Sequence, residues 1–470
     1  MLLREGQSAI RALLGPDGWT CDAARIEPRL WDHRRRFHGA TALLAMPANC
    51  EQVADLLRLC SQHRIGVVPQ GGNTSYCGGA TPSADGSQLL LSLHRMNRIR
   101  HLDRDGFNLI AEAGCTLQQV QEAAESVQRL FPLSLGSEGS CQIGGNLSTN
   151  AGGTAVLRYG TLRELVLGVE AVLPDGRVVE QLRSLRKDNT GYDVKQWFIG
   201  AEGTLGVITA ACLKLFPRPF GHVTAFIGID DLERCVRLLS ALRDALGDAV
   251  VGFEVMPRAA VELALRHIPG ITDPLDAAHP WYVLAEVSLR SAEDNAAAEF
   301  SSSLQGWLDS GLVRDAVLAS SESQRLALWR LRENIPAAQS REGASIKHDV
   351  SLPIAAIPEF VRTAGAAVLA RLPGARLIAY GHLGDGNLHF NFSQPPDGNA
   401  AAFAAHTQSV TRLVHDLVAE RGGSFSAEHG VGQAKVEDLR RYEDPVALEL
   451  MRRLKSALDP LGIMNPGKVL

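Results

Sequence analysis

The chain has 470 residues, of which 45% are hydrophobic and 21% charged, and its formal net charge is −5. This length exceeds what one hydrophobic core supports, so two or more domains are expected. The weak negative charge excludes the basic field that attracts nucleic acid or an anionic membrane. No stretch has the roughly 20 uninterrupted apolar residues of a membrane span, and the first residues lack the apolar run of a signal peptide. We expect a soluble, cytoplasmic protein whose eight scattered cysteines are reduced thiols.

The first predicted elements form a strand–helix–strand unit. Residues 5–30 read as a helix and a connection, residues 42–47 as a strand, residues 50–60 as an amphipathic helix and residues 65–70 as a second strand. The loop at 71–79 is rich in glycine and small hydroxyl residues, and its N–H groups can bind a phosphate. It lacks the G-x-G-x-x-G pattern, so a Rossmann-type nicotinamide site is unsupported, and a plain wide turn is the alternative.

Two further glycine-rich segments follow. Residues 135–153 contain few core-forming side chains, which indicates a surface where a large flat ligand lies against the backbone. Residues 200–209 form the third segment, directly after a strand-like stretch at 197–199. Between these segments, the Pro-Asp-Gly sequence at 174–176 predicts the turn of a hairpin over residues 168–180.

The composition changes after Pro217 and Pro219, which indicates a domain boundary. Strands are predicted beyond it at 223–229, 250–255 and 281–289, and helices at 232–246 and 292–308. This alternation predicts an α+β sheet that is covered by helices on one face.

Residues 381–391 carry two imidazoles on either side of a glycine turn. The residues at 384–387 accept positive φ angles, so the chain should reverse there and bring His382 towards His389. Asn391 lies two residues beyond His389 and therefore shares its strand face.

A carboxylate and a third imidazole follow at Glu428 and His429, again between glycines. Three histidines and one glutamate supply the nitrogen and oxygen ligands of a catalytic zinc site. All eight cysteines precede residue 236, so a thiolate site is excluded in this half of the chain. For each histidine taken alone, a hydrogen-bonding loop residue is the alternative.

The three glycine-rich segments resemble the FAD-binding domain of the vanillyl-alcohol-oxidase superfamily. The second half of the chain resembles the C-terminal domain of its D-2-hydroxy-acid dehydrogenase branch, and within that branch it is most similar to the D-2-hydroxyglutarate dehydrogenases. The resemblance runs from about residue 42 to residue 468 and implies an α+β fold, in which a two-part FAD-binding domain is joined to an α+β substrate (cap) domain. The expected boundaries are 1–217 for the N-terminal helix and FAD-binding domain, 218–425 for the substrate domain with the metal site, and 426–470 for a segment that returns to the FAD domain.

FAD is the cofactor that this resemblance implies. In the family, the first glycine loop wraps the pyrophosphate, the second segment lies along the ribityl chain and flavin, the third holds the adenosine side, and an asparagine near the C-terminus returns to the cofactor. In that order, the expected FAD-binding residues are Gly71, Gly72, Asn73 and Thr74; Ser137, Gly139, Ser140, Gly144, Gly145, Asn146, Thr149, Asn150 and Gly153; Glu202, Gly203 and Ile208; and Asn465. Some relatives attach the flavin through a histidine of the first loop. No histidine lies between residues 69 and 79, so we expect non-covalent FAD and interpret Cys141 as a packing residue.

Two cations of the second half occupy positions that bind substrate carboxylates in the D-2-hydroxyglutarate enzymes. Arg332 lies in a Trp-x-x-Arg-Glu segment, and Lys347 precedes Asp-x-Ser-Leu-Pro. Arginine offers a two-pronged donor to an anion and lysine a compact charge, although a solvated helix residue is the alternative for Arg332. Those enzymes can carry a hydroxyl residue four positions after the arginine, where this chain has Pro336, so the preferred acid is open.

The resemblance implies oxidation of a D-2-hydroxy acid, D-2-hydroxyglutarate in the first place, to its 2-oxo acid with hydride transfer to flavin N5. His382, His389 and Glu428 are the expected ligands of a divalent metal, zinc with manganese as the alternative. His429 is the expected base, and Asn391 is expected to bind the substrate. Electron-transfer flavoprotein or a quinone-linked acceptor would reoxidise the flavin.

Two other functions are compatible with the sequence. One is a D-lactate or glycolate dehydrogenase of the same family, and the other is a non-catalytic flavin-binding subunit of a larger complex. The oligomeric state is open, a homodimer included.

Overall fold

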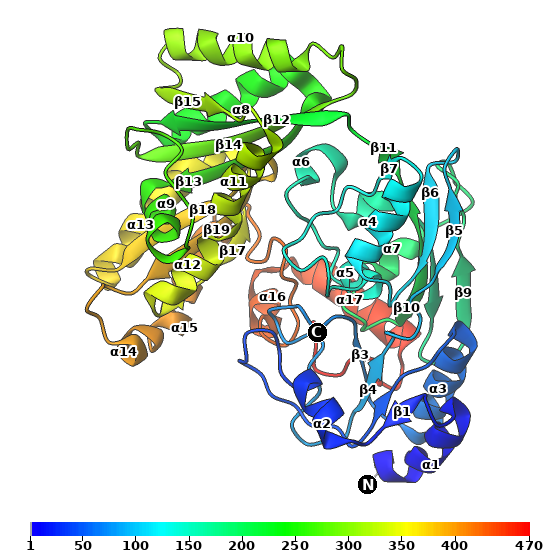
Figure 1. Ribbon diagram of the computed structural model, residues 1–470. Coiled ribbons are helices and arrows are strands. Elements are labelled where there is room, and N and C mark those ends of the chain that lie inside the picture. Colours follow the sequence, from blue (N-terminus) through cyan, green and yellow to red (C-terminus); the bar gives the residue numbers. More distant parts are fainter. Residues whose placement is uncertain (1) are drawn as a thin grey trace. The chain divides into compact units, whose positions relative to one another are not determined.

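The computed structural model describes residues 2–470 and shows two compact units (Figure 1). Unit 1 contains the described residues up to Gly153, residues Gly160–Arg218 and residues Glu428–Leu470; unit 2 contains Thr154–Tyr159 and Pro219–Ala427. The sequence placed its boundaries after residues 217 and 425, whereas the units divide after residues 218 and 427. The short segment Thr154–Tyr159 was not expected in the second unit. Among the described residues, no helix combines the length and the apolar character needed to cross a bilayer.

The first part of unit 1 is a four-stranded sheet with the order β1-β2-β4-β3. Its elements are β1 (Trp19–Thr20), β2 (Leu44–Ala45), β3 (Val67–Gln70), β4 (Leu89–Ser92), α1 (Leu2–Leu14), α2 (Ala23–Ile26), η1 (Glu27–Arg29) and α3 (Cys50–His63). Helix α3 joins two strands that both run parallel to β4, which confirms the strand–helix–strand prediction. Asn49 caps α3 by accepting a hydrogen bond from the N–H of Gln52 at 2.8 Å, and Leu56 and Leu57 of its buried face pack into the core of this sheet.

The second part of unit 1 is a five-stranded antiparallel sheet with the order β5-β6-β10-β8-β9. The strands are β5 (Ile99–Asp103), β6 (Asn108–Glu112), β8 (Val166–Val172), β9 (Val178–Gln181) and β10 (Val207–Lys214), and β7 (Arg129–Leu130) pairs with β11 (Phe216–Pro217). The helical elements are α4 (Leu117–Ser126), α5 (Ile143–Ser148), η2 (Leu162–Leu165), α7 (Lys195–Phe198), α16 (Val436–Tyr442) and α17 (Pro445–Leu458). The predicted hairpin is confirmed, and Gly176 turns it with a φ of 81°.

The strand expected at residues 197–199 is wrong. Trp197 and Phe198 belong to helix α7, and Ile199 follows its last turn. A run of three apolar residues has no periodicity that separates a strand from a short helix, so only the surrounding chain decides between them.

Unit 2 contains an eight-stranded antiparallel sheet with the order β15-β12-β14-β13-β18-β19-β16, in which β17 also pairs with β19 (Figure 1). The strands are β12 (Gly221–Ile229), β13 (Val250–Pro257), β14 (Trp281–Leu289), β15 (Asp315–Leu318), β16 (Ser345–Ile346), β17 (Asp349–Ser351), β18 (Arg376–His382) and β19 (Asn387–Ser393). The helical elements are α6 (Val156–Tyr159), α8 (Leu232–Leu246), η3 (Gly247–Ala249), α9 (Arg258–His267), α10 (Ala296–Asp309), α11 (Glu322–Glu333), α12 (Ile335–Glu342), η4 (Ile354–Ala356), α13 (Ile357–Arg371), η5 (Leu383–Asp385), α14 (Ala400–Ala404) and α15 (Thr407–Ala419).

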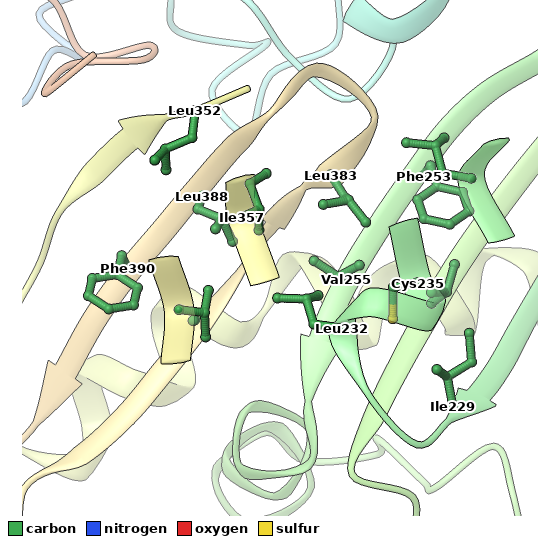
Figure 2. Close-up of a cluster of buried hydrophobic side chains, with 14 of the residues drawn as sticks. Ile229, Leu232, Cys235, Phe253, Val255, Leu352, Ile357, Leu383, Leu388 and Phe390 are labelled. Atoms are coloured by element: carbon green, nitrogen blue, oxygen red, sulfur yellow. The ribbon is translucent and has the colours of Figure 1, made fainter. Parts of the chain in front are cut away.

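Helices cover both faces of this sheet, so the expected one-sided cover is wrong. Phe253 and Val255 of β13 pack with helices α8, α10, α13 and α15 in one core (Figure 2), whereas Met256 belongs to a second core with α9, α11 and α12. Successive strand residues point to opposite faces, and the nearly continuous apolar sequences of β13 and β14 are typical of strands that are buried on both sides.

The first core of unit 2 should depend on its aromatic residues. Phe360 of α13 is fully buried, and its ring centroid lies 4.8 Å from that of Phe390. Phe360→Ala leaves a cavity that the rigid sheet cannot close, so we expect a loss of about 3–5 kcal/mol in the free energy of unfolding of unit 2. Urea unfolding followed by circular dichroism measures the loss. Leu326→Ala, at a side chain that is 53% exposed, is the control and should cost less than about 0.5 kcal/mol; equal midpoints for both variants would contradict the assignment of this core.

Candidate functional site

The first and second glycine-rich segments lie against each other in unit 1. A Cβ atom added to Gly71 would lie 3.4 Å from the Cα atom of Gly145, and one added to Gly72 would lie 2.0 Å from the carbonyl oxygen of Ser140. The two backbones therefore approach more closely than side chains allow. Asn73 adopts a φ of 55°, and its amide donates a hydrogen bond to the carbonyl of Trp31 at 2.7 Å.

An open cleft of about 550 Å³ lies along this contact. Gly71, Gly72, Asn73 and Ser140 line it, as expected for a cofactor site. The remaining lining residues are Pro28, Arg29, Trp31, Asp32, His33, Arg35, Gln70 and Gln142; the sequence predicts residues 31–36 as a small basic patch on a solvated face, not as part of a site. Arg29 and Arg35 make the cleft suitable for a phosphate-bearing ligand, and the basic patch at residues 31–36 was the signal that could have indicated it.

Two buried amide oxygens of unit 1 have no hydrogen-bond donor among the described residues, Oε1 of Gln142 and Oδ1 of Asn465. Gln142 lines the cleft, and Asn465 donates through Nδ2 to the carbonyls of Gly79 and Glu202 at 2.9 and 2.7 Å. The chain end therefore joins the first and third glycine-rich segments. Buried acceptors without donors are costly, so both atoms fit a site that a polar ligand such as FAD completes.

The carboxylate of Glu202 binds the loop after His429. It accepts the N–H groups of Val431 and Gly432 at 2.7 and 2.8 Å, while burial raises the pKa of Glu202 and these two bonds oppose the rise. Contact with the adenosine side would therefore come from the backbone of Glu202, whose φ is 50°. The loop that it holds carries the expected base, and the ring of His429 meets that of Tyr76 edge-on at 4.7 Å.

The other expected FAD-binding residues lie in unit 1 as well, and their roles stay predictions. Gly144, Gly145 and Asn146 form part of the short helix α5, where the amide of Asn146 donates to Sγ of Cys141 at 3.4 Å. Cys141 is 1% exposed, in agreement with a packing role. The remaining ones are Thr74, Ser137, Gly139, Thr149, Asn150, Gly153, Gly203 and Ile208.

Strand register places a carboxylate opposite each of the paired imidazoles in unit 2. The glycine turn between β18 and β19 forms as predicted, with Gly386 at a φ of 86°, and the rings of His382 and His389 lie 6.0 Å apart. Glu254 of β13 is the cross-strand partner of His382, and Asp349 of β17 is that of His389. Directly opposite side chains share a face, so both pairs meet.

In both pairs the carboxylate faces the ring nitrogen Nδ1. Nδ1 of His382 is hydrogen-bonded to Oε1 of Glu254, and Nδ1 of His389 lies 3.8 Å from Oδ1 of Asp349. A carboxylate at Nδ1 is the arrangement found where Nε2 binds a metal, because it fixes the tautomer and the ring orientation.

Glu428, the third expected ligand, belongs to unit 1, so its part in the metal site stays a prediction. Glu428 directly follows Ala427, whose N–H donates to the carbonyl of Asp349 at 3.3 Å. Two imidazoles and a carboxylate fit a zinc ion with an open position.

Helix α11 is held to the sheet by two buried glutamates on neighbouring strands. Glu286 of β14 accepts from Trp329 at 2.6 Å, and Glu254 of β13 accepts from Nε of Arg332 at 2.7 Å. Arg332 is 6% exposed and lies over the ring of Tyr380 at 4.9 Å. It is therefore a fixed residue of the site rather than a solvated helix residue.

Sequence reasoning missed Glu254. Burial raises the pKa of Glu254, but the charges of Arg332 and His382 outweigh burial and lower that pKa to about 2. The carboxylate is thus ionised at neutral pH. The available signal was one charged residue inside the otherwise apolar stretch Val250–Pro257.

The second expected cation lies near helix α12. Nζ of Lys347 donates to Oγ of Ser340 at 3.3 Å. Pro336 is in the first turn of α12, where an N–H has no partner within the helix, so the helix accommodates this departure from the family pattern. Asn391 is 2% exposed; its Oδ1 accepts the N–H of His348 and its Nδ2 donates to Gln339, both at 3.0 Å, and its role towards substrate stays a prediction.

Comparison with known proteins identifies the family of both halves of the chain. Residues 41–181 match the family described as "FAD binding domain", and residues 219–469 match "FAD linked oxidases, C-terminal domain". The mitochondrial D-2-hydroxyglutarate dehydrogenase of Bos taurus is 42% identical over 96% of this chain and 80% of its own length, and that of Arabidopsis thaliana is 37% identical over 98% and 81%.

The chain belongs to the FAD-linked D-2-hydroxy-acid dehydrogenases. A putative mitochondrial D-lactate dehydrogenase of Schizosaccharomyces pombe is also similar, with 34% identity over 99% of this chain and 90% of its own length. The solved structure of p-cresol methylhydroxylase has the same fold, with a TM-score of 0.77, 17% identity, and coverage of 100% of this chain and 96% of that one. This D-2-hydroxy-acid dehydrogenase thus has the two-domain fold of the vanillyl-alcohol-oxidase superfamily, and the predicted fold class is confirmed.

The close approach of the two glycine segments gives a direct test of the FAD site in this dehydrogenase. Gly72→Ala places a methyl group against the carbonyl of Ser140 and must move the first loop, so we expect loss of most of the bound flavin. Acid-released flavin per protein measures it. Gly136→Ala is the matched control in the second segment, because a Cβ atom there meets nothing within 4 Å. Full flavin content in Gly72→Ala would contradict the site.

Proposed function

We propose that this protein oxidises a D-2-hydroxydiacid, D-2-hydroxyglutarate in the first place, to the corresponding 2-oxo acid, with FAD as hydride acceptor and a divalent metal bound at His382, His389 and Glu428. One observation carries the proposal: unit 2 brings the imidazoles of His382 and His389 and the cations Arg332 and Lys347 to the same sheet. The names of the relatives from Bos taurus and Arabidopsis thaliana state the same substrate.

FAD supplies the hydride acceptor when bound. The glycine-rich segments at 71–74 and 137–153 would hold it, together with the two amides of Gln142 and Asn465 that have unused acceptor atoms. The first loop contains no histidine, and Cys141 is buried, so we propose that the cofactor is bound without a covalent link.

A bound zinc ion would act as a Lewis acid on the hydroxyl and carboxylate of the substrate. His429 takes the hydroxyl proton in this proposal, because an imidazole titrates near neutral pH and its loop is fixed by Glu202. Asn391 would orient the substrate or a neighbouring side chain. The remaining carboxylate of a diacid needs its own cation, since an unpaired buried carboxylate is heavily penalised.

For reoxidation of the flavin, we propose electron-transfer flavoprotein or a quinone-linked acceptor, since no nicotinamide fingerprint is present in the sequence. We keep the cytoplasm as the proposed location, although the names of several relatives place those proteins in mitochondria. A D-lactate dehydrogenase is the second candidate function. It is favoured by Pro336, which removes a donor from the diacid site, and by the similarity to the Schizosaccharomyces pombe protein.

Metal dependence can be tested by chelation. Removal of the ion should abolish turnover, because the Lewis acid is lost, while the flavin absorption spectrum stays unchanged, because FAD is held by other residues. Added Zn²⁺ or Mn²⁺ should restore the rate. The measurement is dye reduction by the chelated and the reconstituted protein. Full activity in protein shown to be metal-free would refute this part of the function.

Substrate choice can be tested at Lys347. Arg332→Ala is a poor probe, because it would leave Glu254 buried without its cation. We expect Lys347→Met to lower kcat/KM for D-2-hydroxyglutarate by roughly 30- to 1,000-fold, which corresponds to a charge-assisted contact of about 2–4 kcal/mol, and to affect D-lactate far less.

The charge control for this variant is Arg330→Met. Arg330 is an exposed cation of helix α11 that donates to the carbonyl of Pro269, so its loss should leave both substrates nearly unaffected. Equal losses on the diacid and on D-lactate in Lys347→Met would place Lys347 at the common carboxylate and contradict its proposed role.

A further inference from the structure

One buried carboxylate contacts both a metal-ligand histidine and a substrate-binding arginine. Oε1 of Glu254 is hydrogen-bonded to Nδ1 of His382, and Oε2 accepts from Nε of Arg332 at 2.7 Å. The residue has no solvent-exposed surface. Each oxygen atom thus serves a different functional side chain, and both contacts lie within unit 2.

The backbone allows Glu254 little freedom to serve any other group. It lies in the middle of β13, in cross-strand register with His382 on one side and with Leu284 of β14 on the other. Its neighbours Phe253 and Val255 are buried in the core on the opposite face (Figure 2). A shift of the strand by one residue would turn Glu254 into the apolar core around Phe253 and Val255, so the strand register fixes the position of the carboxylate.

We propose that Glu254 is a positioning residue that sets the affinity for the metal through His382 and at the same time holds Arg332 for the substrate carboxylate. This inference rests on the proposed function and deepens it. A carboxylate at Nδ1 keeps the proton on that nitrogen, turns Nε2 towards the metal and makes Nε2 a stronger donor. The bond to Nε orients the guanidinium plane of Arg332, whose remaining N–H groups can then meet an anion.

Replacing the carboxylate by an amide of the same shape separates these roles from packing. In Glu254→Gln, the single amide oxygen can accept from His382 or from Arg332, and the NH₂ group faces a second donor. One of the two functional side chains therefore loses its partner, whichever way the amide turns.

Glu286 offers a matched control on the next strand. It is also a nearly buried carboxylate on the same sheet face, and it accepts hydrogen bonds from Thr224, Arg325 and Trp329. It holds the same helix, α11, but among the described residues none of these hydrogen bonds involves His382. Glu286→Gln thus removes a buried charge below α11, as Glu254→Gln does, but leaves the hydrogen bond of His382 in place.

The test measures zinc affinity rather than turnover. Flavin-loaded protein is stripped of metal and titrated with Zn²⁺ against a chromogenic chelator. We expect Glu254→Gln to bind zinc about 10- to 100-fold more weakly than the wild type, and Glu286→Gln to bind it with an affinity within about threefold of the wild type. Urea unfolding followed by circular dichroism verifies that unit 2 of each variant is folded. The KM for D-2-hydroxyglutarate should rise in Glu254→Gln as well.

Two results would overturn the inference: an unchanged zinc affinity in Glu254→Gln, or an equal loss in Glu286→Gln. A wild-type protein without measurable zinc affinity would refute the metal of the proposed function itself, and the inference with it.

If Glu254→Gln does not fold, the metal-free wild type provides a second test. Nitrogen-15 spectra of histidine-labelled protein, with the signal of His382 assigned by its loss in His382→Gln, should show the tautomer protonated at Nδ1. The tautomer protonated at Nε2 would contradict the proposal.

Discussion

The site in unit 2 depends on the register of four antiparallel strands, β13, β18, β19 and β17. This register sets Glu254 opposite His382 and Asp349 opposite His389, so each imidazole meets a carboxylate without any loop having to close. Because side chains alternate along a strand, a slip of one residue would move both imidazoles to the opposite face of the sheet. The two packed cores of the sheet therefore stabilise the positions of these site residues as well as the fold.

The candidate site in unit 1 depends on a different constraint, the lack of side chains where two glycine-rich segments meet. Gly72 and Ser140 approach so closely that a methyl group would not fit, and Gly71 meets Gly145 in the same contact. The absence of side chains exposes N–H groups for a bulky ligand, while the amide of Gln142 lines the cleft and that of Asn465 donates to the carbonyls of Gly79 and Glu202. Close backbone contact thus fixes the geometry of the candidate site in unit 1, and paired side-chain charges fix that of the candidate site in unit 2.

The two cations proposed to bind the substrate, Arg332 and Lys347, lie in different surroundings. Arg332 is neutralised by Glu254, so it can be buried beneath α11 without the penalty of an isolated charge. Lys347 is partly exposed and donates a hydrogen bond to the hydroxyl group of Ser340. Glu254 thereby contacts both Arg332 and His382, the residues proposed for the substrate and for the metal.

The sequence by itself determined most of the elements, the glycine turn between His382 and His389, and membership of the flavoprotein family, because turns, periodicity and motif spacing are local properties. It gave helix α8 and strand β14 with their exact bounds, but it misread residues 197–199 and the second helical layer of unit 2. Only the tertiary structure revealed the contacts of Glu254 and the place of the two arginines in the cleft. It also showed that the carboxylate of Glu202 accepts hydrogen bonds from the loop beyond His429. Such pairings join residues that are far apart in the chain. Strand register and burial decide them, and the local sequence pattern determines neither.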